Sequence, residues 1–443
     1  MCPSTRRRSI ALILMSSVLT ALGIYLSPNR KPNTSNSASF NHSAPISTHS
    51  EGSTSSTKPE TFIELRERRA VTQPASDIFV VSGLVGLETG FKSLIELMGE
   101  HGIAFYNSSI LRLSQGPNGL IAQDDVVILK INSQWDERGG TNTDLIKEVI
   151  NMVVSHPDGF VGEVVVADNG QAQYGSTGHG GSLTYERNNA EDHKQSCQRV
   201  VDSFSTSFKV STWLWDNITS NKVDEYSEGD MEDGYVLDSE INPNTKIRVS
   251  YPKFKTKYGT YISFRKGIWH NDLKSYSNNL KVINIPVLKT HSSYGVTACV
   301  KHYMGVASDK LTSRNEGRAH SSIGYGGMGT QMVQSRMPTL NVLDALWVNA
   351  IPRNGPSSSY EDATRRGVVA VCRDPVALDY WASKYILKQV AERLGFKDVS
   401  SIDPDVVDSG FGKWLRLSMH EIERAGYVTT CDEGRVNVHI KTK

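Results

Sequence analysis

The chain has 443 residues, which is enough for one large domain or two modest ones. Its 48 lysines and arginines nearly balance its 47 aspartates and glutamates, so nothing suggests the basic footprint of a nucleic-acid-binding protein. The five cysteines form no Cys-x-x-Cys pair, and we therefore expect no zinc knuckle and no iron–sulfur cluster.

The N-terminus resembles a targeting segment. Three arginines at 6–8 precede an uncharged apolar run at 10–26, the layout of an export signal or a signal anchor. As a helix this run spans about 25 Å, marginal for a hydrocarbon core of about 30 Å. No clear Ala-x-Ala cleavage site follows it, and residues 7–10 loosely resemble a twin-arginine signal. We expect an extracytoplasmic protein that is exported, or anchored in a membrane, by residues 1–26.

Residues 27–76 are predicted to be a disordered linker. Ser, Thr, Asn and Pro dominate its first part and large apolar side chains are nearly missing, so this part cannot bury enough surface to fold. A single folded domain is expected from 77 to 443.

Apolar strand-like runs alternate with helix-like segments through this domain. Strands are predicted at 77–84, 125–132, 162–169, 279–290, 367–375 and 435–442, and helices at 90–102, 141–156, 188–208, 296–305, 374–395 and 411–426. The alternation predicts an α/β domain with a mostly parallel sheet and helices on both faces. Residues 207–275, rich in aromatic and polar side chains, interrupt it and are expected to form an inserted β-rich cap.

Four predicted strands end in polar residues. Ligands of parallel α/β sheets collect at the carboxyl ends of the strands. A single polar strand end can be a helix cap or a solvated loop, but four in succession indicate one convergent site. The residues concerned are Lys130, Asn132 and Asp144; Asp168 and Asn169; Lys289, Thr290 and His291; and Arg373 and Asp374.

A glycine-rich loop at 170–181 follows the strand that ends at Asp168. Its glycines would allow backbone N–H groups to approach an anion, but the loop matches no standard phosphate-binding motif. It is equally consistent with a flexible surface loop, and His179 within it could reach a ligand.

The segment 284–305 concentrates basic residues. Lys289 and His291 end a strand, and the helix expected at 296–305 would place Thr297 and Lys301 on one face. Two lysines can bracket a carboxylate or phosphate, and a histidine between them can transfer protons or bind a metal. Alternatively, the lysines form a structural ion-pair network with Asp168 or Asp374.

Several motifs resemble the family catalogued as domain of unknown function 362. The likeness covers roughly residues 77–395, and its most specific parts are the Pro-x-x-Lys-Thr-His and Asp-Pro-x-x-x-Asp elements. Many relatives append a ferredoxin-like module with clustered cysteines; this chain has none, so the resemblance implies no electron transfer. His302 stands where an asparagine is common. The resemblance marks Lys130, Asn132, Thr143, Asp144, Lys289, His291, Thr297, Lys301, His320, Asp344, Asp374 and Asp379.

The sequence thus favours an enzyme acting on a small anionic substrate. Lys289 and Lys301 would hold the anion and His291 would transfer protons, while Asp168 and Asp374 would orient these groups or bind a divalent metal. A non-catalytic binding protein for a small anion is an alternative, and so is a metal-dependent enzyme using His291 with His320 or His179. The predicted substrate-binding residues are Lys130, Asn132, Asp144, Asp168, Asn169, Thr297 and His320.

Overall fold

A computed structural model describes residues 64–86, 88–170, 182–188, 191–313 and 316–443. The predicted export segment 1–26, the linker up to residue 63, and the loop 171–181 with His179 lie outside the described residues. Backbone amides of Arg68, Val71 and Ala75 donate to carbonyls between residues 434 and 438. The folded body therefore begins before the predicted start at residue 77, because main-chain bonds to the C-terminal strand hold this polar segment.

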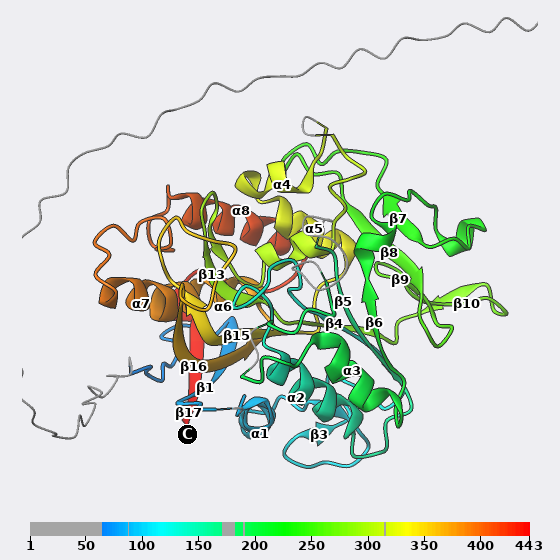
Figure 1. Cartoon of the computed structure of the whole chain (residues 1–443), viewed down its shortest axis with the longest axis horizontal. Coiled ribbons are helices and arrows are strands. Elements are labelled where there is room, and N and C mark those ends of the chain that lie inside the picture. The colour runs from blue at the N-terminus through cyan, green and yellow to red at the C-terminus, as the bar shows by residue number, and fades with distance from the viewer. Residues whose placement is uncertain (1–63, 87, 171–181, 189–190, 314–315) are drawn as a thin grey trace, which may run out of the picture. The chain divides into compact units, whose positions relative to one another are not determined.

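One large sheet forms the centre of the body (Figure 1). Its strands pair in parallel except for β1 with β16, β16 with β15, and β13 with β14, which are antiparallel. The predicted mostly parallel sheet is confirmed. In spatial order the main path is β17 (Val436–Thr442), β1 (Ser76–Ser82), β16 (Ala363–Cys372), β15 (Leu340–Asn349), β12 (Leu280–Asn284), β4 (Val126–Lys130), β5 (Glu163–Asp168) and β6 (Val210–Leu214), with β13 (Val287–His291) beside β15 and β14 (Gly295–Thr297) beside β13.

The central strands are buried on both faces, as their continuous apolar runs predict. Every residue of β4 and β5 is buried. Alternate side chains enter two different cores: Ile128 packs into one, and Val127 and Leu129 into the other.

Helices cover both faces of the sheet, as predicted (Figure 1). The core containing Leu129 also receives α1 (Phe91–Glu100), α2 (Thr143–Val154) and α3 (Cys197–Ser205). The opposite core receives α4 (Ala319–Ser322), α5 (Gly327–Ser335), α6 (Pro375–Ala382), α7 (Lys388–Arg393) and α8 (Gly410–Arg424). No helix in the described ranges is long and apolar enough to cross a bilayer.

The inserted segment forms a separate antiparallel sheet. In spatial order its strands are β11 (Ser275–Ser277), β10 (Gly267–His270), β9 (Tyr261–Ser263), β8 (Ser250–Lys255) and β7 (Gly234–Leu237). The predicted start at 207 was too early, since Val210–Leu214 pairs in parallel with β5 as the edge strand β6. A small two-stranded sheet, β2 (Tyr106–Asn107) with β3 (Gln115–Gly116), lies between α1 and β4 in sequence.

Three predicted elements differ from the structure. The helix expected at 188–208 begins only at Cys197, as α3. The strand expected at 279–290 is two strands, because the chain leaves β12 at Ile285–Pro286 and then pairs with β15 as β13. The helix expected at 296–305 is strand β14 followed by a 3-10 helix, Lys301–Gly305. Thr297 pairs with Lys289 across a hairpin, so it shares no helical face with Lys301.

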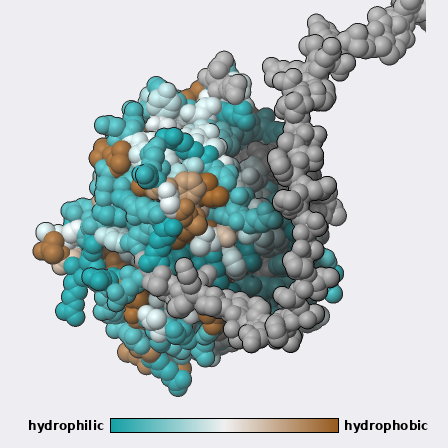
Figure 2. Space-filling model, turned by 60° about the vertical axis from the view of Figure 1, so that its left-hand side comes forward, coloured by the Kyte–Doolittle hydropathy of each residue, from teal (hydrophilic) through white to brown (hydrophobic). Residues whose placement is uncertain are grey.

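On the face shown in Figure 2, hydrophilic side chains predominate and the hydrophobic ones form small separate patches. That face therefore carries no broad apolar surface.

Candidate functional site

A small polar cavity lies beyond the carboxyl ends of β4 and β5. Its volume is about 30 Å³, room for about two water molecules at roughly 10–15 Å³ each. We call it the lysine cavity. The chemistry of its wall comes from Lys130, Asn132, Asp168, Asn169, Thr297, Lys301 and His302.

One wall is a buried ion pair. Lys130 is 1% exposed, and its Nζ lies 2.8 Å from Oδ1 of Asp168. The other carboxylate oxygen of Asp168 accepts the backbone N–H and the hydroxyl of Ser133. Burial lowers the pKa of Lys130, and the charge of Asp168 opposes this effect. Asp168 is therefore paired with Lys130, and not with Lys289 or Lys301 as the structural alternative for those two lysines expected.

Gly305 lets the backbone approach this pair. A Cβ atom at residue 305 would stand 2.2 Å from Oδ1 of Asp168 and 2.3 Å from Nζ of Lys130. Both contacts are far below van der Waals distance, so a side chain at residue 305 would force the ends of the buried Asp168 and Lys130 side chains to move.

Lys301 is a buried lysine of the cavity wall that has no counter-ion in direct contact among the described residues. It is 6% exposed, and its Nζ makes no hydrogen bond to a described residue; its contact is with the Tyr294 ring, 5.7 Å from the ring centroid. Burial, and then the charge of Lys130, lower its pKa from 10.5 to about 7, although Asp309 acts in the opposite direction. At neutral pH about half of the molecules carry a neutral amine here.

Three further polar atoms of the wall have no hydrogen-bond partner among the described residues: Asn132 Oδ1, Thr297 Oγ1 and His302 Nε2. His302 Nδ1 lies 2.7 Å from Oδ1 of Asn284, whose amide nitrogen donates elsewhere, so Oδ1 accepts the proton of Nδ1. The Nε2 atom of His302 is left with a lone pair. A buried polar group without a partner costs about 1–3 kcal/mol, and a ligand that paired these atoms would recover that free energy.

Lys289 lies behind the cavity rather than in its wall. It is fully buried, and its Nζ donates to the carbonyl of Gly139 at 2.6 Å. Its pKa is lowered by burial and then by the charge of Lys301, with Asp168 opposing. The charges of Lys301 and Lys130 thus disfavour the ammonium form of Lys289, whereas Asp168 and Asp344 favour it.

His291 is held as a neutral ring. Its Nδ1 accepts the backbone N–H groups of Ser293 and Tyr294 at 3.1 and 3.2 Å, so the ring proton is on Nε2. Burial, with the charge of Lys301 next, lowers the pKa of His291 to about 2. A group with this pKa takes up no proton near pH 7. The proton-transfer role expected of His291 is therefore not supported.

The same geometry disfavours His291 as a metal ligand, because its only outward nitrogen carries the proton. The Nδ1 atom of His320 lies 3.2 Å from Asp309, and the Tyr294 ring contacts both imidazoles, with centroid distances of 5.1 and 6.2 Å. In the described ranges no group of three or more His, Cys, Asp or Glu side chains is placed to hold a metal. His179, the other proposed ligand, lies outside those ranges.

Two predicted binding residues have structural partners. Asp144, in the first turn of α2, accepts the side-chain amide of Gln195 at 2.7 Å and is not part of the cavity wall. Asn169 lines the cavity, but its amide nitrogen donates to the Tyr235 hydroxyl at 2.7 Å and to the Ala307 carbonyl at 3.1 Å, which ties β5 to the inserted sheet.

Asp374 lies away from the lysine cavity. The prediction assumed that all four strand ends meet at one edge, but β16 runs antiparallel to its neighbours, so its carboxyl end lies beside the first residues of β15. Asp374 caps α6 by accepting the N–H groups of Val376 and Ala377. It also accepts from Ser76, Thr429 and Thr430.

Asp379, farther along α6, contacts the backbone that precedes Lys301. Its carboxylate accepts the backbone N–H groups of Cys299 and Val300 at 2.6 and 2.9 Å, immediately before Lys301. Burial raises the pKa of Asp379 to about 7. The Asp-Pro-x-x-x-Asp element therefore positions the turn that carries Lys301.

The resemblance also marked Thr143 and Asp344. The Thr143 hydroxyl accepts from Gln195, and Asp344 accepts the backbone N–H of Asn142. Both thus anchor the start of α2 rather than the cavity.

Sequence reasoning missed several wall residues: Gln134, Trp135, Met304, Gly305 and Pro356. Gln134 and Trp135 follow directly after the strand end at Asn132, and Met304 and Gly305 follow Lys301 within one turn, so proximity in sequence could have indicated them. Pro356 comes from a distant loop and has no such signal.

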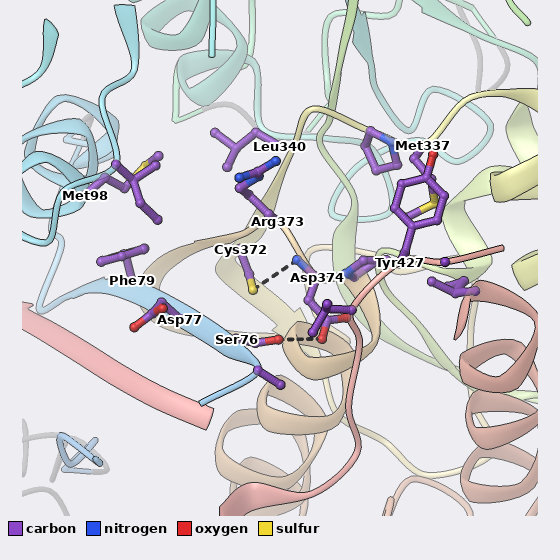
Figure 3. Close-up of a pocket in the computed structure, with 17 residues that line it drawn as sticks. Ser76, Asp77, Phe79, Met98, Met337, Leu340, Cys372, Arg373, Asp374 and Tyr427 are labelled. Atoms are coloured by element: carbon purple, nitrogen blue, oxygen red, sulfur yellow. Dashed lines mark hydrogen bonds between the residues drawn. The ribbon is translucent and has the colours of Figure 1, made fainter. Parts of the chain in front are cut away.

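A larger hollow of about 430 Å³ lies elsewhere, between the start of β1 and the end of β16 (Figure 3). We call it the Arg373 hollow. Its two carboxylates, Asp77 and Asp374, already accept hydrogen bonds from other side chains. Asn132, Thr297 and His302, each with a buried polar atom that has no partner among the described residues, all line the lysine cavity, which we therefore take as the candidate active site.

Fold and site together define a mixed α/β protein with a buried, lysine-lined cavity at the carboxyl ends of parallel strands. The family model described as "Domain of unknown function (DUF362)" matches residues 273–384, so this segment of the chain is similar to that family. The matched segment carries Lys289, His291, Lys301 and Asp379, so the expected family is confirmed over a shorter range than 77–395. No curated protein and no solved structure matches the chain significantly.

Proposed function

We propose that this protein is an enzyme that binds a small anionic substrate in the lysine cavity, and that Lys301 exchanges a proton with it. The observation that carries the proposal is a buried amine without a hydrogen-bond partner among the described residues, in the same cavity wall as the unpaired polar atoms of Asn132, Thr297 and His302. Lys301 here takes the role that the sequence suggested for His291.

The charges of the site support an anion as ligand. Three buried lysines lie near one another, and Asp168 is directly paired with Lys130 alone. An anion next to Lys301 would favour the ammonium form and raise its pKa, the reverse of the effect of Lys130. Binding above pH 7 should therefore take up a proton. The small volume favours a carboxylate-sized or carbonate-sized group in the cavity.

The reaction class is proton transfer. With a pKa of about 7 in the free protein, Lys301 takes up a proton when the anion binds, and the resulting ammonium can donate a proton to the substrate or stabilise negative charge that develops in the transition state. The lone pair of His302 Nε2 can accept a hydrogen bond from a substrate O–H or N–H group. The oxygen atoms of Asn132 and Thr297 can form further hydrogen bonds that orient the substrate.

Calorimetry tests the binding step. Formate, acetate, bicarbonate, pyruvate and phosphate are titrated at pH 8 in two buffers with different ionisation enthalpies, which reports proton uptake. Wild-type protein should bind at least one of these anions with uptake of up to one proton, and Lys301→Met should lose this uptake. The exposed Lys310 supplies the control, since Lys310→Met should behave as wild type. Absence of binding by every anion would contradict the proposal.

A second measurement separates catalysis from capture. Pyruvate in D₂O is followed by NMR for exchange of its methyl protons, which requires proton removal from carbon. An anion that binds with proton uptake but is always returned unchanged would identify the non-catalytic binding protein instead.

We also propose an extracytoplasmic location, with residues 1–26 as an export signal or membrane anchor. The arginines at 6–8 and the apolar run at 10–26 support this location. Fractionation of cells that express the full chain or a chain lacking residues 2–26 tests it, because only the full chain should leave the soluble cytoplasmic fraction.

A further inference from the structure

We propose that the Arg373 hollow is a second ligand site, which binds a small monocarboxylate with an apolar body. The site is separate from the lysine cavity and does not depend on its proposed function. It lies where the start of β1, the start of β15, the end of β16, the end of α1 and the chain after α8 meet (Figure 3).

The walls supply an apolar surface of suitable size. Phe79, Met98 and Leu340 line the hollow and are almost fully buried within the fold, so its floor is packed and already formed. At its rim, Tyr427 is 46% and Val428 is 67% exposed. A volume of about 430 Å³ falls within the range of about 300–1,000 Å³ typical of small-molecule sites. An apolar body seated here would remove part of this rim from water.

The charged side chains that line the hollow are Asp77, Asp374 and Arg373, and they differ in their hydrogen-bond partners. Asp77 accepts hydrogen bonds from Asn437 and His439, both at 2.9 Å, and Asp374 accepts from five donors. The guanidinium of Arg373 is exposed and forms no hydrogen bond or ion pair with any described residue. In Figure 3 its side chain stands among the lining residues, with Met98 to one side and Met337 to the other.

A guanidinium presents parallel N–H donors that match the two oxygens of a carboxylate. Asp77 and Asp374 accept hydrogen bonds from other groups and neither is paired with Arg373, so the N–H groups of Arg373 are left for an incoming carboxylate. The combination of a free arginine with an apolar floor therefore fits an amphiphilic acid better than a sugar or a cation.

The thiol of Cys372, next to Arg373, is not placed to capture the ligand covalently. Cys372 lines the hollow, but its Sγ accepts the backbone N–H of Asp374 at 3.3 Å and the residue is buried. Burial raises the pKa of Cys372 well above its ordinary value, so the thiol stays protonated and unreactive. Reversible binding is expected.

Decanoate and decan-1-ol are a matched pair of probes, alike in chain and different in charge. Calorimetry with the full-length chain should show saturable binding of decanoate and weaker binding of decanol. The substitution Arg373→Gln should weaken decanoate binding at least about tenfold, as expected for the loss of a charge-assisted bond, and leave decanol binding unchanged. Val428→Asp, at an exposed rim position that folding does not require, should also weaken decanoate binding by placing a negative charge near it.

Two control variants test whether decanoate binds at the Arg373 hollow. Arg199 lies on α3 in an exposed ion pair with Glu186, so Arg199→Gln removes a similar charge far from the hollow and should bind decanoate as wild type does. Lys301→Met should also leave decanoate binding intact, which excludes the lysine cavity as the site. Equal affinity for decanoate and decanol, unchanged decanoate binding in folded Arg373→Gln, or no decanoate binding by the wild type would each overturn the proposal.

Discussion

Replacing Lys301 by methionine removes a buried amine and keeps an unbranched apolar side chain of similar length. The folded protein holds the pKa of this amine at about 7 instead of 10.5. A shift of about 3.5 pKa units corresponds to about 5 kcal/mol by which folding disfavours the charged amine. Below pH 7 the lysine is charged in both the folded and unfolded states, and wild-type protein carries the whole penalty.

The sign of the pH dependence follows from proton binding. Between pH 7 and 10.5 the unfolded chain binds a proton at Lys301 that the folded chain does not, so wild-type stability rises with pH in this window. We expect Lys301→Met to be more stable than wild type by about 2–5 kcal/mol at pH 7. This advantage should shrink by about 1.4 kcal/mol per pH unit between roughly pH 7.5 and 10.

Urea unfolding followed by circular dichroism, at pH values from 6 to 10, measures this difference in free energy. Lys310→Met provides the control, because Lys310 is exposed and its removal should give a small, pH-independent change. Using the difference between wild type and variant cancels most of the titration of the other groups. A Lys301→Met advantage that stays constant from pH 6 to 10 would refute the description of Lys301 as a buried amine with a lowered pKa.

Three other substitutions probe the surroundings of Lys301. Gly305→Ala should lower the free energy of unfolding by more than about 2 kcal/mol, because the new methyl group meets the ion pair at 2.2 Å; Gly324→Ala, which meets no atom within 4 Å, should be nearly neutral in the same urea titration. Asp168→Asn should destabilise the protein by about 3–5 kcal/mol because Lys130 loses its counter-charge. The destabilisation should be smaller at pH 10 than at pH 6, because Lys130 becomes neutral more readily at pH 10. Asp379→Asn should weaken anion binding at Lys301, measured by calorimetry, since the amide cannot accept both N–H groups as the carboxylate does. Asp379 holds a proton in the folded state up to about pH 7, whereas the unfolded chain releases it near pH 3.8. The free energy of unfolding of the wild type should therefore fall relative to that of Asp379→Asn as pH rises from 4 to 7. A difference between the two proteins that stays constant over this range would contradict the raised pKa of Asp379.

Part of the site could be predicted because it lies at the ends of locally recognisable strands. Lys130 and Asp168 end β4 and β5, two apolar runs that pair side by side in parallel, and Lys301 lies in the segment predicted to carry an anion-binding lysine. The chemistry of His291 could not be predicted, since its neutral state comes from the hairpin backbone that donates to Nδ1 and from its burial. Pro356 in the cavity wall and the contact of Asp379 with the turn before Lys301 could not be predicted either, because each brings together segments that lie far apart in the chain.

The amino-acid sequence by itself determined the α/β class, the helices on both faces and the positions of β1, β4, β5, β12, β16 and β17, because apolar periodicity and helix caps act between residues close in the chain. It did not indicate the central strand β15. Strand direction and neighbour order depend instead on hydrogen bonds between distant segments. The antiparallel course of β16 therefore became visible only in the tertiary structure, and it moved Asp374 from the expected active site to a helix cap beside the Arg373 hollow. The lowered pKa of Lys301 likewise has no local cause, because it arises from burial among groups that several strands and helices bring together.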